Sequence, residues 1–174
     1  MLAPGSPGPN SELSAIRQGP GPVVVSEETG EVVRAALDLA DATGGAFDPT
    51  VEPLMEVYGF HGGVPLPPPE ADLAAARAQV GWQKVVLARG PDGAPSIDAG
   101  GAALDLSSIA KGHAVDRVSG ALSALGFGAH MVEVGGETRV AGMGVSGPLW
   151  RIGVDDPIAS AAPGSTLAAV VELT

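Results

Sequence analysis

The sequence predicts an α+β fold with a largely antiparallel sheet and flanking helices. Two observations favour this class over a doubly wound parallel sheet. Segments with strand-like composition outnumber segments with helical spacing, and neighbouring strand segments are joined by short turns. The last strand pattern is still running at Thr174, so we expect the chain to hold an incomplete domain.

The helices are predicted from caps and apolar spacing. Ser26 is a natural N-cap for a helix over 27–43, because its hydroxyl can accept a hydrogen bond from a free amide of the first turn. Gly44 supplies the end of that helix. The other helical segments are a short turn at 11–18 and helices over 51–58, 70–80 and 109–125.

The strands are predicted from short apolar runs bounded by turn residues. They cover 83–88, 96–98, 102–106, 129–134, 137–141, 149–154 and 166–173. The glycine pair at 135–136 interrupts one strand pattern, which indicates a bulge or a place where a ligand approaches the backbone. Glu133 and Glu137 flank this pair, and the alternative is that both are solvated glutamates beside a turn.

Composition excludes some classes of partner. The chain has 174 residues, with 9 basic and 20 acidic side chains, so its net charge of −11 argues against nucleic acid and acidic membranes. It has no cysteine, which excludes disulfides and thiolate metal sites. We expect a flexible, Pro/Gly-rich segment over 1–22 and a folded region over 23–174. The first residues lack the basic and then apolar stretch that is typical of a signal peptide.

The run DLSSIAKGHAVDR at 105–117 predicts a strand end, a tight turn and the start of a helix, with Ser107 or Ser108 as the N-cap. The apolar stripe of this helix is Val115, Val118, Leu122 and Leu125. One turn back, the stripe reaches Lys111, a cation on the buried face at the positive end of the helix dipole. An anion such as phosphate would relieve both penalties. The alternative is a surface lysine that extends from the helix end.

Two carboxylates are further candidates for the same site as this lysine. Asp105 could serve a magnesium ion or a ligand hydroxyl or amine, or it could be an ordinary turn residue. In the run GAFDPTV at 45–51, Pro49 holds Asp48 on an extended segment, next to the apolar face of Phe47. The alternative for this run is a helix C-cap followed by an Asp-Pro turn.

Three motifs together resemble the ApbE family of magnesium-dependent FAD:protein FMN transferases. They are GAFDPTV at 45–51, DLSSIAKGHAVDR at 105–117 and VEVGGETRVAG at 132–142, in the order and spacing of the family. The segments SELS at 11–14 and WRIGV at 150–154 also resemble it, so the likeness covers about residues 10–174. His113 stands where the family usually has tyrosine, and Ser107 and Ser108 where many members have glycines.

The resemblance implies an ApbE-like fold and a specific activity. The family cleaves FAD and attaches FMN through a phosphoester bond to a threonine or serine of an acceptor flavoprotein, releasing AMP. By position, the residues implied to bind FAD are Ala46, Phe47, Asp48, Asp105 and Lys111. Ser108 is implied to help bind Mg²⁺, with the remaining ligands in a C-terminal part that this sequence does not contain.

Two other functions stay open at this point. The same site could split FAD hydrolytically into FMN and AMP, or the chain could bind flavin without catalysis. Family members are often exported lipoproteins of the cell envelope, but nothing in this sequence assigns a compartment.

Overall fold

The computed structural model describes residues 11–62, 67–157 and 166–174. The chain forms two units, which we call unit 1 (Met1–Ala110) and unit 2 (Lys111–Thr174). Their boundary falls inside the helix α5 (Ser107–Ala124). No helix in the described part of the chain is both long enough and apolar enough to cross a membrane.

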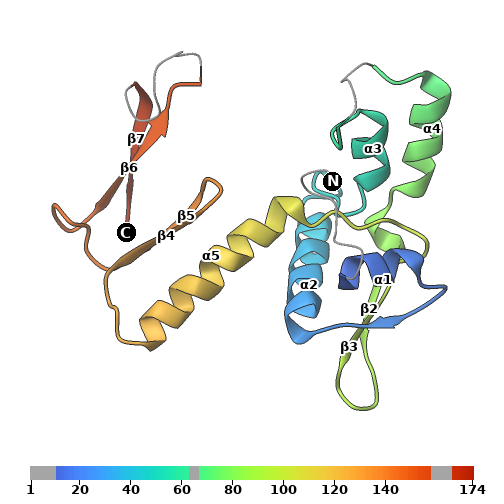
Figure 1. The fold of residues 1–174 in the computed structure, drawn as a ribbon, viewed down its shortest axis with the longest axis horizontal. Coiled ribbons are helices and arrows are strands. Elements are labelled where there is room, and N and C mark those ends of the chain that lie inside the picture. Colours follow the sequence, from blue (N-terminus) through green and yellow to red (C-terminus); the bar gives the residue numbers. More distant parts are fainter. Residues whose placement is uncertain (1–10, 63–66, 158–165) are drawn as a thin grey trace. The chain divides into compact units, whose positions relative to one another are not determined.

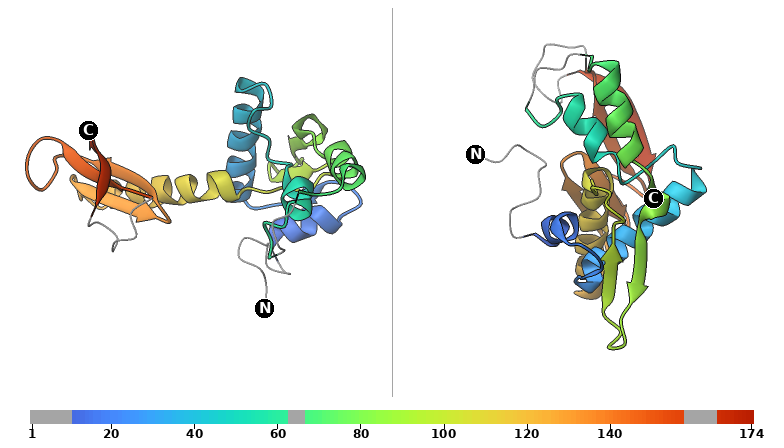
Figure 2. Two further views of the ribbon diagram at one scale, coloured as in Figure 1. Left: turned by 90° about the horizontal axis from the view of Figure 1, so that it is seen from above. Right: turned by 90° about the vertical axis from the view of Figure 1, so that its right-hand side faces the viewer.

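Unit 1 combines helices with a small antiparallel sheet (Figures 1 and 2). Its strands lie in the order β1-β3-β2, with Ile97 of β3 opposite both Val23 and Leu87. The elements before α5 are α1 (Glu12–Gln18), β1 (Val23–Val24), α2 (Glu27–Ala42), α3 (Glu52–Val57), α4 (Glu70–Gln79), a 3₁₀ turn (Trp82–Lys84), β2 (Val86–Arg89) and β3 (Pro95–Asp98).

The core of unit 1 lies between α2 and this sheet, where Val33 and Ile97 are completely buried. The described part of the predicted flexible segment contributes to it, because α1 buries Ile16 there. The rest of that prediction, at 1–10, lies outside the described residues. The core is made of Ile16, Val25, Val32, Val33, Ala36, Val85, Ile97, Ala99, Leu104 and Leu106.

The strand predicted over 102–106 is wrong. Ala102, Leu104 and Leu106 are buried in alternation, as the pattern required, but the segment joins no sheet among the described residues. It is an extended connection whose Asp105 amide donates instead to the carbonyl of Pro49, at 2.8 Å. The alternation of buried side chains over 102–106 therefore indicated packing against the core of unit 1 and not pairing with a neighbouring strand.

Unit 2 holds the rest of α5 and two antiparallel hairpins. One hairpin joins β4 (His130–Val134) to β5 (Glu137–Ala141), and the other joins β6 (Trp150–Asp155) to β7 (Leu167–Leu173). Gly135 and Gly136 form the two-residue turn between β4 and β5, with φ of 58° and 96°. A turn of this kind needs positive φ at both positions, so the glycine pair is a hairpin turn and not an interruption of one strand.

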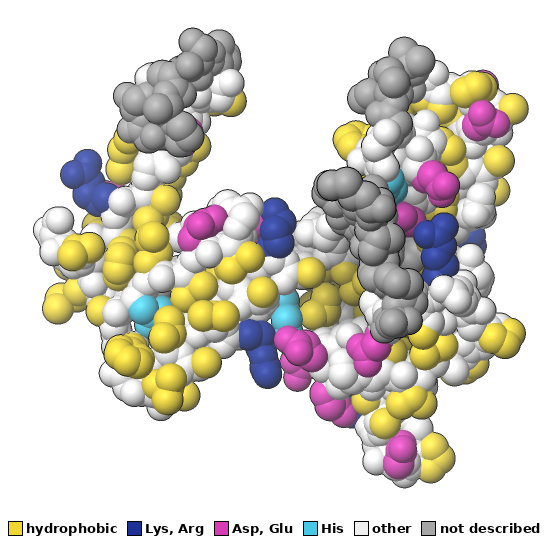
Figure 3. All heavy atoms as spheres, viewed as in Figure 1, with side chains coloured by type: hydrophobic (Ala, Val, Ile, Leu, Met, Phe, Trp, Pro, Cys, Tyr) yellow, Lys and Arg dark blue, Asp and Glu magenta, His cyan; other side chains and the backbone are white. Residues whose placement is uncertain are grey.

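The apolar stripe predicted on α5 is only partly correct. Val115 is 2% exposed and Ser119 is 3% exposed, whereas Val118 is 46% exposed and Leu125 is 74% exposed. Ser119 is buried without penalty because its hydroxyl lies 2.8 Å from Nε2 of His130, whose Nδ1 lies 2.9 Å from the carbonyl of Phe127. Figure 3 shows hydrophobic side chains gathered on the surface of unit 2, over α5 and the hairpins.

Glu12 joins α1 to the start of α2. Its carboxylate accepts hydrogen bonds from the Ser26 amide at 2.6 Å, from the Ser26 hydroxyl at 2.9 Å and from the Thr29 hydroxyl. The Ser26 hydroxyl also accepts from the Thr29 amide, which confirms the predicted N-cap. The Thr29 hydroxyl, followed by the two donors of Ser26, lowers the pKa of Glu12 below its ordinary value.

We expect Glu12→Gln to lower the free energy of unfolding by about 1 kcal/mol near neutral pH, because these donors lose an ionised acceptor. A carboxylate whose pKa is depressed in the folded state stabilises the fold above its ordinary pKa of 4.5. That stabilisation disappears as the pH falls through the folded-state pKa. Urea unfolding at neutral pH and at about pH 3 should therefore show the difference from wild type shrinking.

Glu31→Gln is the matched control, since it removes the same charge from an exposed position of α2. It should change the free energy of unfolding by less than about 0.5 kcal/mol. Equal losses of unfolding free energy in the two variants would show that the hydrogen bonds of the Glu12 carboxylate do not stabilise the fold.

Candidate functional site

The loop at 44–50 follows the end of α2. Gly44 takes a left-handed φ of 61°, as expected for the residue after a helix C-cap, and the Thr43 hydroxyl accepts from the Phe47 amide at 3.1 Å. Phe47 is half-buried and packs against the core of unit 1, while Ala46 is exposed. The loop therefore presents Ala46 to solvent and fixes Phe47 by its apolar side.

The Asp48 carboxylate organises this loop. Its Oδ1 accepts from the Thr50 amide at 2.8 Å and from the Thr50 hydroxyl at 2.6 Å, and its Oδ2 accepts from the Trp82 amide at 3.3 Å. The Thr50 hydroxyl, which is fully buried, accepts in turn from the Gly81 amide at 2.7 Å. These contacts match the Asp-Pro turn that the sequence left open, and the FAD contact of Asp48 stays a prediction.

Asp105 connects that loop to the start of α5. Its amide binds the Pro49 carbonyl, and its Oδ1 accepts from the Ser107 amide at 2.8 Å. The predicted cap at Ser107 or Ser108 is therefore wrong, because α5 already begins at Ser107 and Asp105 binds its first amide. A carboxylate suits this position, since the free amides and the dipole of a helix start both attract negative charge. Ser108 lies exposed in the first turn.

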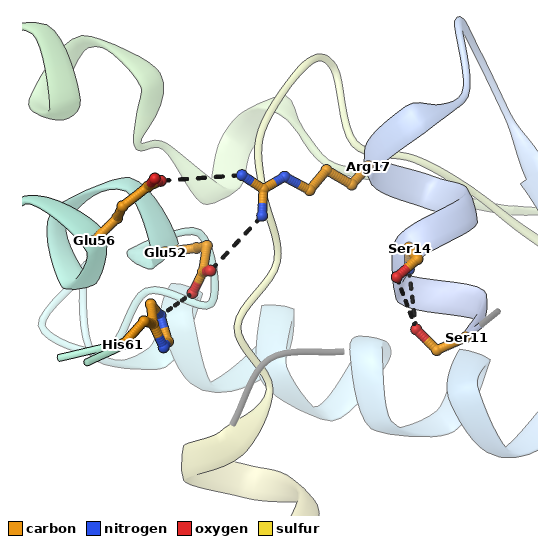
Figure 4. A network of polar contacts seen from close by, with 6 residues as sticks. All are labelled: Ser11, Ser14, Arg17, Glu52, Glu56 and His61. Atoms are coloured by element: carbon orange, nitrogen blue, oxygen red, sulfur yellow. Dashed lines mark hydrogen bonds and ion pairs between the residues drawn. The ribbon is translucent and has the colours of Figure 1, made fainter. Parts of the chain in front are cut away.

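A cleft of about 140 Å³ borders Asp105 and Ser107 and includes a carboxylate that the sequence analysis missed. Glu52 is 8% exposed, and its Oε2 lies 3.0 Å from Nε2 of His61, while its Oε1 lies 3.8 Å from the Arg17 guanidinium. Figure 4 shows Glu52 between these two partners, and the Arg17 guanidinium also contacts Glu56. The sequence offered one signal for Glu52, which is its position two residues after the Asp48-Pro49-Thr50 run.

Lys111 belongs to unit 2 and differs from its prediction. Its side chain is 46% exposed and not buried, and Nζ lies 2.8 Å from Oε2 of Glu137 and 3.3 Å from the Gly135 carbonyl. The ammonium lowers the pKa of the Glu137 carboxyl, mainly through their hydrogen bond. Glu137 therefore already provides one anion beside this cation, and the FAD contact of Lys111 stays a prediction.

The β4–β5 turn fixes the stem of that lysine. A Cβ at Gly135 would lie 3.2 Å from Cδ of Lys111, so the absent side chain leaves room for the lysine to pass. Oε1 of Glu133 accepts from the Gly136 amide at 2.5 Å and closes the turn. Glu133 is exposed beside the turn, as the alternative had it, but both glutamates also have defined partners.

Comparison with known proteins shows the family of this chain. The model of the ApbE family matches residues 6–174. The chain belongs to the ApbE family. It is 37% identical over 152 residues to an FAD:protein FMN transferase of Vibrio cholerae serotype O1, and 36% identical over 155 residues to one of Haemophilus influenzae. These alignments cover 85% of this chain and 45% and 44% of the two relatives.

Solved ApbE structures share the α+β fold that the sequence predicted. The flavin transferase ApbE of Vibrio cholerae matches with a TM-score of 0.74 at 37% identity, over 86% of this chain and 49% of that one. The ApbE protein of Thermotoga maritima matches with a TM-score of 0.77 at 30% identity, over 94% and 52%. This ApbE-family chain therefore spans about half the length of the relatives it matches.

The described residues of this ApbE-family chain do not fit a complete magnesium site. Within 11–62, 67–157 and 166–174, no three His, Cys, Asp or Glu side chains group as metal ligands. Ser108 and Asp105 would supply at most part of the six oxygens that Mg²⁺ prefers, and Asp105 already holds the Ser107 amide.

We expect Asp48→Asn to lower the free energy of unfolding by about 1–3 kcal/mol, because an amide nitrogen then faces a donor, either at Thr50 or at Trp82. Asp38→Asn removes the same charge from an exposed position of α2 and should cost less than about 0.5 kcal/mol. Urea unfolding of both variants measures the difference. A harmless Asp48→Asn would mean that this carboxylate does not organise the loop.

Proposed function

We propose that this chain provides the FAD-binding part of a magnesium-dependent FAD:protein FMN transferase. The observation that carries the proposal is the family match over 6–174, together with relatives at 36–37% identity that bear this name. The half-exposed Lys111 ammonium near the start of α5 supports it, because a diphosphate needs such a donor. The acceptor is a threonine or serine hydroxyl of a target flavoprotein.

The reaction is a transfer at phosphorus. The acceptor hydroxyl oxygen bonds to the phosphorus on the FMN side of the FAD diphosphate, the bond to the AMP oxygen breaks, and AMP leaves. Such a transfer depends mostly on positioning and on stabilising the charge that grows on the leaving group. Mg²⁺, when bound, supplies part of that stabilisation.

The proposed reaction gives each of the predicted site residues a role. Lys111 binds diphosphate oxygens, and Ala46, Phe47, Asp48 and Asp105 bind FAD. Ser108 would contribute one oxygen to a bound Mg²⁺ ion. The hydroxyl proton passes to a carboxylate, for which Asp105 and Glu52 are the candidates because both line the same cleft.

Incubation of the full chain with FAD, Mg²⁺ and an acceptor peptide that carries one threonine tests the proposal. We expect flavin covalently attached to the peptide and an equal amount of AMP, both measured by mass spectrometry. The same peptide with valine in place of threonine is the control. Free FMN with no labelled peptide would instead indicate an FAD pyrophosphatase, and bound FAD with no AMP would indicate a flavin-binding protein without catalysis.

We expect Lys111→Ala to weaken FAD binding by at least about tenfold, because a charged hydrogen bond to phosphate is lost. Riboflavin, which has no phosphate, should bind with less than about a twofold change. Equilibrium dialysis with detection of flavin absorbance measures both ligands.

Arg151→Ala is the matched control, because it removes another partly exposed cation of unit 2 that pairs with a glutamate, here Glu172 at 3.8 Å. It should leave both affinities unchanged. Equal losses of FAD and riboflavin affinity in Lys111→Ala would remove the phosphate role from this lysine.

A further inference from the structure

The ammonium to which we assign the FAD diphosphate is already paired within the chain. A lysine has three N–H donors, and here Glu137 Oε2 at 2.8 Å and the Gly135 carbonyl at 3.3 Å provide two acceptors. The carboxylate is an anion, as a phosphate oxygen is, and it meets the same donor. One donor is left over, but a diphosphate that binds it lies beside the Glu137 carboxylate, and the repulsion between these two anions makes them compete for the ammonium.

We propose that Glu137 is a resident counter-ion that FAD must displace from Lys111, and that it thereby sets the affinity of the site for phosphate-bearing flavins. This inference rests on the function proposed above. Glu137 becomes a specificity-determining residue, because only a ligand that carries strong negative charge regains what the broken ion pair loses. Riboflavin carries none.

The exposure of the pair makes displacement feasible. The Lys111 and Glu137 side chains are 46% and 39% exposed, although Oε2, the oxygen that contacts the ammonium, is itself buried. Ion pairs between partly exposed side chains are weak because water still reaches the remaining atoms of both groups. A released Glu137 carboxylate can therefore turn into solvent at small cost. A diphosphate also offers more charge and more acceptor oxygens than one carboxylate.

The remaining contacts keep Lys111 in place after this exchange. The Gly135 carbonyl contacts the ammonium independently of Glu137, and the missing Cβ of Gly135 gives the lysine stem its path. Glu133 holds the turn itself through the Gly136 amide. Glu137 can thus leave the ammonium without loss of the element that positions it.

Equilibrium dialysis of FAD and riboflavin with single and double variants tests this exchange. We expect Glu137→Gln to bind FAD about three- to fivefold more tightly than wild type, the gain that corresponds to an exposed ion pair. Riboflavin affinity should not change. In the Lys111→Ala background, Glu137→Gln should give no gain, because the competition needs the ammonium.

Glu133→Gln is the matched control. It removes the same charge from the same hairpin, and its amide oxygen can still accept from the Gly136 amide, but no contact joins Glu133 to Lys111 among the described contacts. FAD affinity should change by less than about twofold. Equal gains for Glu133→Gln and Glu137→Gln would reduce the effect to general charge and overturn the inference.

The outcomes separate this inference from the proposed function. If Lys111→Ala weakens FAD binding but Glu137→Gln leaves it unchanged or weaker, Glu137 does not compete, and only the inference fails. If wild type binds FAD no better than riboflavin and Lys111→Ala changes neither, the phosphate role of Lys111 fails and the inference fails with it. Thermal unfolding of each variant identifies any loss of folding.

Discussion

Asp105 joins two motifs that lie more than fifty residues apart in the sequence. Its amide fixes the Pro49 carbonyl of the loop that follows α2, and its carboxylate binds the first amide of α5. The buried side chains on both sides of it, Leu104 and Leu106, hold the segment to the core of unit 1. The start of the longest described helix and the loop at 44–50 are thus joined through one residue. Its carboxylate suits the helix start, where free amides and the dipole attract negative charge.

Three charged side chains described above are paired within the chain. Asp48 accepts three hydrogen bonds, Glu52 lies between Arg17 and His61, and Lys111 lies against Glu137. Such pairing lets charged side chains sit close to a packed core without an uncompensated charge. A ligand of such a side chain would compete with its existing partner, and its affinity would then reflect a difference between two sets of contacts.

Sequence reasoning was most successful where a local rule dictates the result. The Ser26 cap, the Gly44 helix end and the antiparallel class all depend on neighbouring residues or short turns, and all are present. One local rule failed, because Asp105 and not Ser107 or Ser108 binds the first amide of α5. The other failures arose where distant partners decide. The surface position of Lys111 depends on Glu137, and the lack of a strand at 102–106 depends on Pro49. Glu52 was missed because its burial becomes visible only once the chain is folded.

The contact between Ser119 and His130 has a consequence for how α5 meets β4. A carbonyl can only accept, so Nδ1 of His130 must carry the proton toward Phe127, and in the neutral ring Nε2 is left to accept from the Ser119 hydroxyl. This fixes the tautomer and gives the two side chains one pairing direction. A hydrophobic contact at this position would tolerate a small rotation of the helix about its axis. A hydrogen bond tolerates such a rotation less well, because its strength depends on direction. The hydrogen bond between Ser119 and His130 thus restrains the rotation of α5 about its own axis relative to β4.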